Sequence, residues 1–97
     1  MLCHVVLYRL KPGISEEDKN RLIDEARTKL ALLPGVSNLK VGRGIAGQKT
    51  DYSVGLVMDF QDEAVLEAYR VNPDHQRFVR EVVQPLVAEI WRFDFTY

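Results

Sequence analysis

Residues 51–79 constrain the fold more than any other part of the chain, because they hold a strand, a helix, a break and a second helix start in one run. Over residues 52–60 apolar side chains occupy every second position, which is the period of a strand with one strongly apolar face. Asp62 follows and can cap a helix. The apolar side of that helix is predicted to consist of Ala64, Val65, Ala68 and Tyr69.

The break that follows places a histidine at a helix start. Asn72 precedes a proline and is therefore pushed out of the helical conformation, so it ends one helix and can cap the next. His75 then lies in the first turn, where the helix dipole disfavours a second proton on its ring. A neutral imidazole can accept a proton, and Tyr69 could orient a substrate oxygen or share that proton. Alternatively, Tyr69 packs in the core and His75 only bonds a neighbouring loop.

The remaining segments alternate strand-like and helix-like patterns. β-Branched and aromatic residues, apolar stripes and Pro-Gly breaks divide the chain. We predict a strand over residues 2–10, a helix from Ser15 through Leu33, a strand over 36–46, a helix over 73–85 and a strand over 90–97. The glycines Gly42, Gly44 and Gly47 suggest bulges in or next to the strand over 36–46, or close approach of another segment. This order predicts an α+β, ferredoxin-like domain: a four-stranded antiparallel sheet with helices on one face.

The strands are apolar on both sides, although helices can cover only one face of the sheet. In the first strand, Val6, Tyr8 and Leu10 alternate with Cys3, Val5 and Leu7. Apolar residues on both faces are expected where both faces are buried. The simplest cover is the same face of a second copy. We therefore predict a homodimer, with two sheets packed together or closed into a barrel.

The size of the chain indicates one domain over residues 1–97, and its cysteine content requires no oxidising compartment. A chain of 97 residues buries about 60–65 per cent of its unfolded surface, so a partner subunit would add useful stability. Cys3 is the single cysteine and has no internal disulfide partner. No apolar run reaches the length of a membrane span, and no leader pattern is present. We expect a cytoplasmic protein.

Charge and motifs exclude several classes of function. Thirteen basic against 14 acidic residues give a net charge of −1, which provides no general attraction for nucleic acid or an anionic membrane. The chain contains no metalloprotease, redox CxxC, phosphate-loop or serine-hydrolase motif. We expect neither a nucleic-acid nor a membrane partner.

Four segments resemble one family. They are the opening Cys3–Gly13, the break Leu33–Val36, the strand Asp51–Phe60 and the run Tyr69–Val79 with its proline and histidine. Together they resemble the stress-responsive A/B barrel (Dabb) family over nearly the whole chain. The resemblance implies a dimeric α+β barrel.

The family includes plant stress proteins, polyketide cyclases and bacterial members without an assigned activity, so the fold alone does not choose a function. A distant similarity to olivetolic acid cyclase implies that Tyr69 and His75 act as an acid–base pair. His4 matches a histidine of the cyclase's first strand, and here it either approaches the pocket or bonds a neighbouring strand. Ser53 and Asn72 stand where the cyclase has two further histidines, so its substrate is not carried over.

The same resemblance implies a cation site, with Mg as the candidate ion, at the end of the first helix. Its ligands would be the backbone carbonyls of Leu30, Leu33 and Val36. Alternatively, water and the proline-glycine turn satisfy the same carbonyls.

Three functions follow. The first is a dimeric domain that binds a small apolar or aromatic molecule near His75. The second is a cyclase-like or isomerase-like enzyme in which His75 is the base and Tyr69 the orienting group. The third is a structural oligomer without a ligand.

Overall fold

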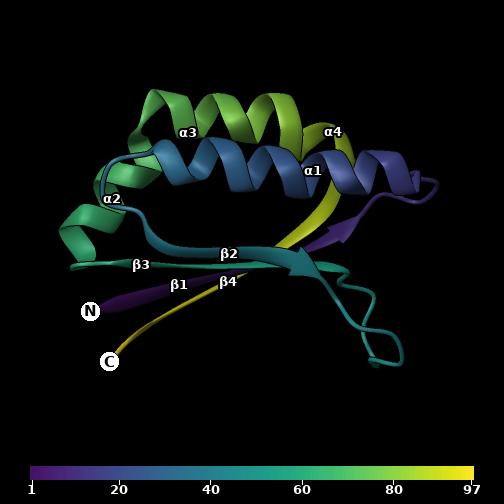
Figure 1. The fold of residues 1–97 in the computed structure, drawn as a ribbon, viewed down its shortest axis with the longest axis horizontal. Coiled ribbons are helices and arrows are strands. Elements are labelled where there is room, and N and C mark those ends of the chain that lie inside the picture. Colours follow the sequence, from purple (N-terminus) through teal and green to yellow (C-terminus); the bar gives the residue numbers. More distant parts are fainter.

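Four antiparallel strands form a sheet in the order β2-β3-β1-β4, and the helices lie together on one of its faces (Figure 1). The computed structural model describes residues 1–97. The strands are β1 (Leu2–Leu10), β2 (Ser37–Arg43), β3 (Val54–Phe60) and β4 (Val87–Thr96). The helices are α1 (Glu16–Lys29), α2 (Glu63–Val71), α3 (Pro73–Phe78) and α4 (Gln84–Leu86), with a 3₁₀ turn over Leu30–Leu32 and a π-helical turn over Val79–Val83. The predicted ferredoxin-like order is confirmed. None of the helices has both the length and the apolar character needed to cross a membrane.

Polar caps start three of the helices where the sequence predicts them. Ser15 and Asp62 each accept a hydrogen bond of 3.0 Å from the backbone N–H three residues further on. Asn72 accepts one of 2.8 Å from the N–H of Asp74. Each cap satisfies an amide that the first helical turn leaves unpaired. The cap at Asn72 fixes the abrupt change of direction between α2 and α3.

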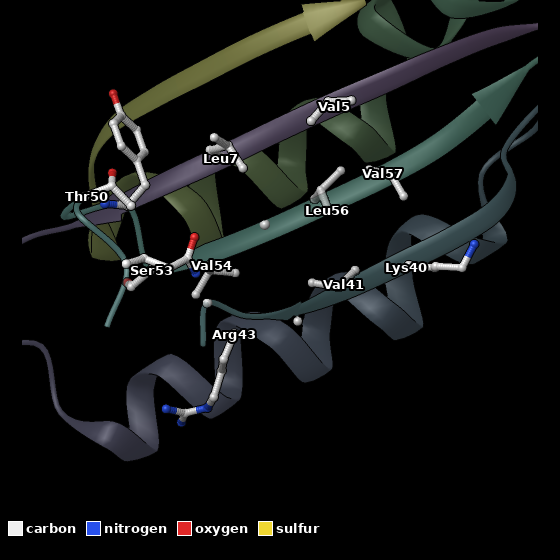
Figure 2. A pocket seen from close by; sticks show the side chains of 15 residues that line it. Val5, Leu7, Lys40, Val41, Arg43, Thr50, Ser53, Val54, Leu56 and Val57 are labelled. Carbon is white, nitrogen blue, oxygen red and sulfur yellow. Dashed lines mark hydrogen bonds between the residues drawn. The ribbon is translucent and has the colours of Figure 1, made fainter. Parts of the chain in front are cut away.

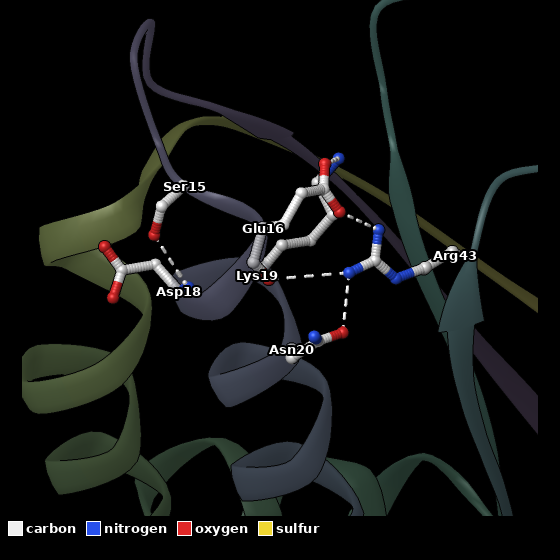
Figure 3. Close-up of polar contacts among 6 residues, drawn as sticks. All are labelled: Ser15, Glu16, Asp18, Lys19, Asn20 and Arg43. Atoms are coloured by element: carbon white, nitrogen blue, oxygen red, sulfur yellow. Dashed lines mark hydrogen bonds and ion pairs between the residues drawn. The ribbon is translucent and has the colours of Figure 1, made fainter.

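Two arginines hold α1 against the edge strand β2. Arg43, at the end of β2, donates to Glu16 at 2.5 Å and to Asn20 at 2.6 Å (Figure 3). Arg27 donates through two nitrogens to the carbonyl of Val41, at 3.0 and 2.7 Å. Exposed ion pairs contribute little stability, about 0–1 kcal/mol, so the contacts of Arg43 chiefly position the helix over the sheet.

The core lies between the sheet and the helices. The register of β1 with β3 places alternate residues of each strand on the helix side. This side is buried and comprises Leu2, His4, Val6, Tyr8, Val54, Leu56, Met58 and Phe60. Leu22, Ile23 and Ala26 of α1 cover it from above. His4 is therefore a polar residue within the core.

The opposite face of the sheet carries exposed aromatic side chains. Four of them follow one another at every second residue of β4 and its end: Trp91, Phe93, Phe95 and Tyr97 are 57, 57, 42 and 66 per cent exposed. Phe93 and Phe95 lie 6.2 Å apart by ring centroid, and Phe95 and Tyr97 lie 6.1 Å apart. Large contiguous apolar patches typically mark interfaces. No helix of the chain lies on this face (Figure 1).

The irregularity of β2 was predicted at the wrong residues. The strand is shorter than residues 36–46, and its register shift lies near its start, at Asn38. Asn38 has a φ of 51°, a left-handed conformation that asparagine tolerates better than most residues, and its amide donates to Asp59 at 2.8 Å. Gly42 pairs regularly with Gly55. The side-chain bond to β3, rather than a glycine, accompanies the bulge.

The predicted apolar side of α2 is also partly wrong. Leu66 and Tyr69 are the buried residues of this helix and Val65 packs half-buried against the core as predicted, whereas Ala64 and Ala68 are exposed. The core-facing stripe is narrow, and α2 lies at one end of the sheet (Figure 1). Tyr69 keeps its predicted place on that stripe.

Candidate functional site

The helix break brings together the tyrosine and the histidine that the sequence singles out. Tyr69 lies near the end of α2 and is only 4 per cent exposed, whereas His75, in the first turn of α3, is partly buried. Their ring centroids are 4.2 Å apart, with the planes inclined at 42°. The structure therefore places the two predicted site residues in contact.

The hydrogen bond of His75 orients its proton-accepting nitrogen. Nδ1 lies 3.4 Å from the backbone carbonyl of Arg70. Because a carbonyl can only accept, the proton of the neutral ring belongs on Nδ1, and Nε2 keeps its lone pair. Burial lowers the pKa of His75, the carbonyl of Arg70 opposes this, and the nearby His4 and Arg92 lower the pKa further. The direction matches the sequence argument, but burial is the main cause.

A small cavity lies beside this pair, between the sheet and the helices. Its volume is about 50 Å³, and its lining includes His4, Tyr8, Tyr69, His75, Val79 and Arg92. Neither Tyr8 nor Tyr69 hydrogen-bonds through its hydroxyl to another group of the protein. Burial raises the pKa of Tyr8 to about 12 although Arg92 acts against it, and burial, with Tyr8, raises that of Tyr69. Both phenols are therefore neutral hydrogen-bond donors at ordinary pH.

His4 is held by a carboxylate on the neighbouring strand. Its Nδ1 is hydrogen-bonded to Asp94 of β4, and the other oxygen of Asp94 accepts a hydrogen bond of 3.0 Å from Arg70. A carboxylate on one ring nitrogen fixes the orientation of an imidazole. The ring of His4 meets that of Tyr69 edge-on, at 6.2 Å. Of the two roles left open by the sequence, His4 combines both: it bonds a neighbouring strand and lines the cavity.

An open groove continues outward from the cavity. Its volume is about 600 Å³, and it shares four lining residues with the cavity: Arg70, His75, Val79 and Arg92. Gln76, Arg80 and Gln84 complete the groove. The cavity is largely apolar in its depth, while three arginines and two glutamines surround its mouth.

The helical wall of the cavity contains the π-helical turn. Val79 and Val83, its first and last residues, both line the cavity. Such turns occur frequently at functional sites, because the extra residue shifts the side chains that follow.

Comparison with known families supports the resemblance seen in the sequence. The family model of the stress responsive A/B barrel domain, Dabb, matches residues 2–97. The chain belongs to the Dabb family.

Solved structures share the fold of this Dabb domain. A Dabb family protein with a ferredoxin-like fold from Mesorhizobium loti is 30 per cent identical, with a TM-score of 0.87 over 99 per cent of this chain and 95 per cent of its own. A dimeric ferredoxin-like protein of unknown function from Thermobifida fusca is 21 per cent identical, with a TM-score of 0.87 over 99 and 90 per cent. The hydroxynitrile lyase of Passiflora edulis is 17 per cent identical, with a TM-score of 0.83 over 97 and 90 per cent. A search of curated proteins found no match. These comparisons do not test the similarity to olivetolic acid cyclase, which stays a prediction.

The carbonyls suggested as a cation site of the Dabb domain already take part in a turn. Leu30 accepts a hydrogen bond of 3.2 Å from the N–H of Leu33, and Leu33 accepts one of 3.3 Å from that of Val36. A second lone pair remains on the oxygens of Leu30 and Leu33, but three neutral carbonyls would supply at most half of an octahedral Mg²⁺ shell and none of the carboxylates through which Mg²⁺ is usually bound. The cation site stays a prediction.

Four residues of the site escaped the sequence argument: Tyr8, Arg70, Arg92 and Asp94. Arg92 and Asp94 occupy alternate positions of β4, on the same side as His4 of β1. The sequence did contain a signal for these two residues: Arg92 and Asp94 are charged, although they lie on the strand face that should meet the apolar helices. Ser53, by contrast, lies away from the cavity at His75 and lines a different hollow.

That second hollow lies on the sheet face opposite the helices. It has a volume of about 410 Å³ and shares only Leu56 with the cavity at His75. Val5, Leu7 and Val57 project into it from the two central strands (Figure 2). Its walls offer no histidine and no buried phenol. The buried phenols and both histidines of the chain therefore line the cavity on the helix side of the sheet.

Proposed function

We propose that this Dabb domain binds a small molecule in the cavity beside His75. One observation carries the proposal: the hydroxyls of Tyr8 and Tyr69, on rings that are more than nine-tenths buried, line a cavity without a partner in the protein. Neither hydroxyl oxygen is sealed off from the cavity, so both can donate a hydrogen bond to a molecule placed there. A ligand carbonyl oxygen beside these phenols would accept from them, and a ligand hydroxyl would in addition donate to the lone pair on Nε2 of His75.

The dimensions of the site support a ligand that extends outward. A cavity of about 50 Å³ accommodates only a few non-hydrogen atoms, because one water occupies about 10–15 Å³ on this measure. Typical ligand pockets are larger, about 300–1,000 Å³. The groove of about 600 Å³ at the mouth provides the remaining space. An apolar or aromatic end of the ligand enters the largely apolar cavity, and the rest of the ligand lies in the polar groove outside.

The exposed aromatic face supports a homodimer. Trp91, Phe93 and Phe95 of β4 expose an apolar surface to solvent on the face of the sheet that no helix covers. The structural relatives from Thermobifida fusca and from Jannaschia, the latter 26 per cent identical, are described as dimeric. The same face of a second copy would bury these rings by sheet-on-sheet packing. The ligand cavities would then lie on the outer, helical sides of the dimer.

A second candidate function is acid–base catalysis at the same site, of the cyclase or isomerase type. Neutral His75 with a lone pair on Nε2 is suited to accept a proton from a carbon beside a carbonyl, and the hydroxyl of Tyr69 to hydrogen-bond the carbonyl oxygen. The hydroxynitrile lyase of Passiflora edulis has the same fold, which supports only the suitability of the scaffold. A structural oligomer without a ligand is the remaining alternative.

Ligand binding is tested by NMR titration with acetophenone, a small aromatic ketone. We expect shifts at the side chains of Tyr69 and His75, and the shift at His75 should be weakened in Tyr69→Phe, which keeps the ring and removes the hydroxyl, and retained in Gln48→Ala, a change in the second hollow. Shifts confined to that hollow, or none at millimolar probe, would contradict the proposal. For the second function, His75→Ala should abolish turnover of a substrate without changing its affinity, whereas unchanged turnover would remove His75 from the mechanism.

A further inference from the structure

Three arginines surround the mouth of the cavity, but only one is neutralised within the chain. Arg70 pairs with Asp94 at 3.0 Å and with Glu67 at 3.3 Å. Arg80 and Arg92 form neither an ion pair nor a side-chain hydrogen bond within the chain, although both line the groove. Because the whole chain carries a net charge of −1, this excess of positive charge is local.

Arg92 occupies an unusual position for a charged residue. It pairs in register with Val6 on the helix-facing side of the sheet, where most neighbours are buried and apolar. It lines the inner cavity as well as the outer groove. Its charge also reaches both ends of the site, since it lowers the pKa of Tyr8 and that of His75. Arg92 is itself exposed, and because no carboxylate of the chain pairs with it, its guanidinium remains available to bind an anion at the mouth of the cavity.

The polar groups of the site fall into two sets of different chemistry. Tyr8 and Tyr69 offer neutral hydroxyl donors in the depth of the cavity. Arg80 and Arg92 offer guanidinium groups at the mouth, with Gln76 beside them as a neutral donor. A guanidinium binds a carboxylate through two parallel hydrogen bonds. A hydroxyl donor suits the oxygen of a ketone or an alcohol.

We infer that the ligand is a small carboxylic acid with a second oxygen, a ketone or hydroxyl, at its other end. The carboxylate is held at the mouth by Arg92 and Arg80, and the second oxygen enters the cavity between Tyr8 and Tyr69. This inference rests on the proposed ligand-binding function and names the class of molecule bound there.

The test compares 4-oxopentanoate with its uncharged methyl ester, and with inorganic phosphate as an anion that lacks the organic end. Affinities are measured by calorimetry, and the side-chain NMR signals of His75 and Tyr69 locate the binding. The variants are Arg92→Gln and Arg80→Gln. Arg21→Gln is the matched control, because Arg21 is exposed on α1 and forms no ion pair.

We expect the acid to bind tighter than its ester by on the order of tenfold, as for a charge-assisted hydrogen-bonded pair. Arg92→Gln should remove this preference, Arg80→Gln should reduce it, and Arg21→Gln should leave it unchanged. Equal binding of acid and ester at His75 would overturn the inference and leave the proposed function intact. Phosphate binding as tightly as the acid would overturn the assignment to a carboxylate. Absence of any shift at His75 would remove the proposed function together with the inference.

Discussion

His75 lies against Tyr69, with ring centroids 4.2 Å apart, because the polypeptide turns sharply at Asn72 and Pro73 between two helices. The contact shields one face of the imidazole from water. The carbonyl of Arg70 accepts from Nδ1 on the same ring. The pair thus combines an imidazole base that is partly shielded from water with a protonated phenol. The titration of His75 and the contribution of the Tyr69 hydroxyl can be measured separately.

Stability should fall as the pH is lowered through the range where His75 titrates. Burial in the folded protein lowers the pKa of His75 below its ordinary value of 6.5. As the pH falls, the ring of His75 therefore takes up a proton in the unfolded chain before it does so in the folded chain. The free energy of unfolding then decreases between about pH 7 and pH 5. Denaturant unfolding at several pH values measures this, and NMR titration gives the pKa of the ring. His75→Asn should flatten the dependence, and an unchanged slope in this variant would assign it to another group.

Substitutions at Tyr69 should separate packing from hydroxyl chemistry. Tyr69→Phe keeps the ring contacts with Phe60 at 5.0 Å and with His75. Since the lost hydroxyl has no partner in the protein, the free energy of unfolding should change by less than about 1 kcal/mol. Tyr69→Ala leaves a cavity and should cost about 3 kcal/mol or more. A large loss of stability in Tyr69→Phe, measured by denaturant unfolding, would mean that the hydroxyl is bonded within the fold.

Local chemistry explains why much of the fold could be predicted from the sequence. Ser15, Asp62 and Asn72 start helices through hydrogen bonds to amides two or three residues away. Strand alternation likewise depends on neighbouring residues only. The break at Asn72 is equally local, and for this reason the proximity of Tyr69 and His75 could be anticipated from seven residues of sequence.

The other half of the site depends on strand pairing between distant parts of the chain. His4 meets Asp94, and Val6 meets Arg92, through the pairing of β1 with β4. No spacing along the chain indicates such contacts, since they arise only when the first and last strands become neighbours in the sheet. The bulge at Asn38 escaped prediction for a similar reason, because its stabilising partner Asp59 lies in another strand.

A charge on the aromatic face should disrupt the proposed dimer. Phe93 is 57 per cent exposed at the centre of this row in β4, and a second copy packed on the face would bury it. Phe93→Glu would place an unpaired carboxylate in that interface, which is costly. Size-exclusion chromatography with light scattering should give twice the 11.1 kDa chain mass for the wild type and the single mass for the variant. Leu32→Glu is the control, as Leu32 is 80 per cent exposed outside this face. A wild-type monomer at micromolar concentration would contradict the dimer.

Two glycines with the same backbone conformation can be used to measure how closely α2 packs against the turn at Gly35. Gly13 has a φ of 81° and Gly35 a φ of 85°, so alanine at either position incurs left-handed strain of about 1–2 kcal/mol. A Cβ at Gly13 would meet no atom within 4 Å, whereas at Gly35 it would lie 2.4 Å from Cγ1 of Val65 in α2. Gly35→Ala should therefore cost more than Gly13→Ala in free energy of unfolding, by about 1–3 kcal/mol for the overpacking.

The excess cost at Gly35 should be recovered in part by Val65→Ala in the same chain, since the smaller side chain makes room for the added Cβ. α2 also carries Tyr69, so a displaced helix should change the NMR signals of Tyr69 and His75 in Gly35→Ala and leave them unaltered in Gly13→Ala. Equal losses of stability in the two alanine variants would mean that the side chain of Val65 can move away from the added Cβ at little cost. In that case the seating of α2 would depend on the buried side chains of Leu66 and Tyr69 rather than on the close approach of the turn at Gly35.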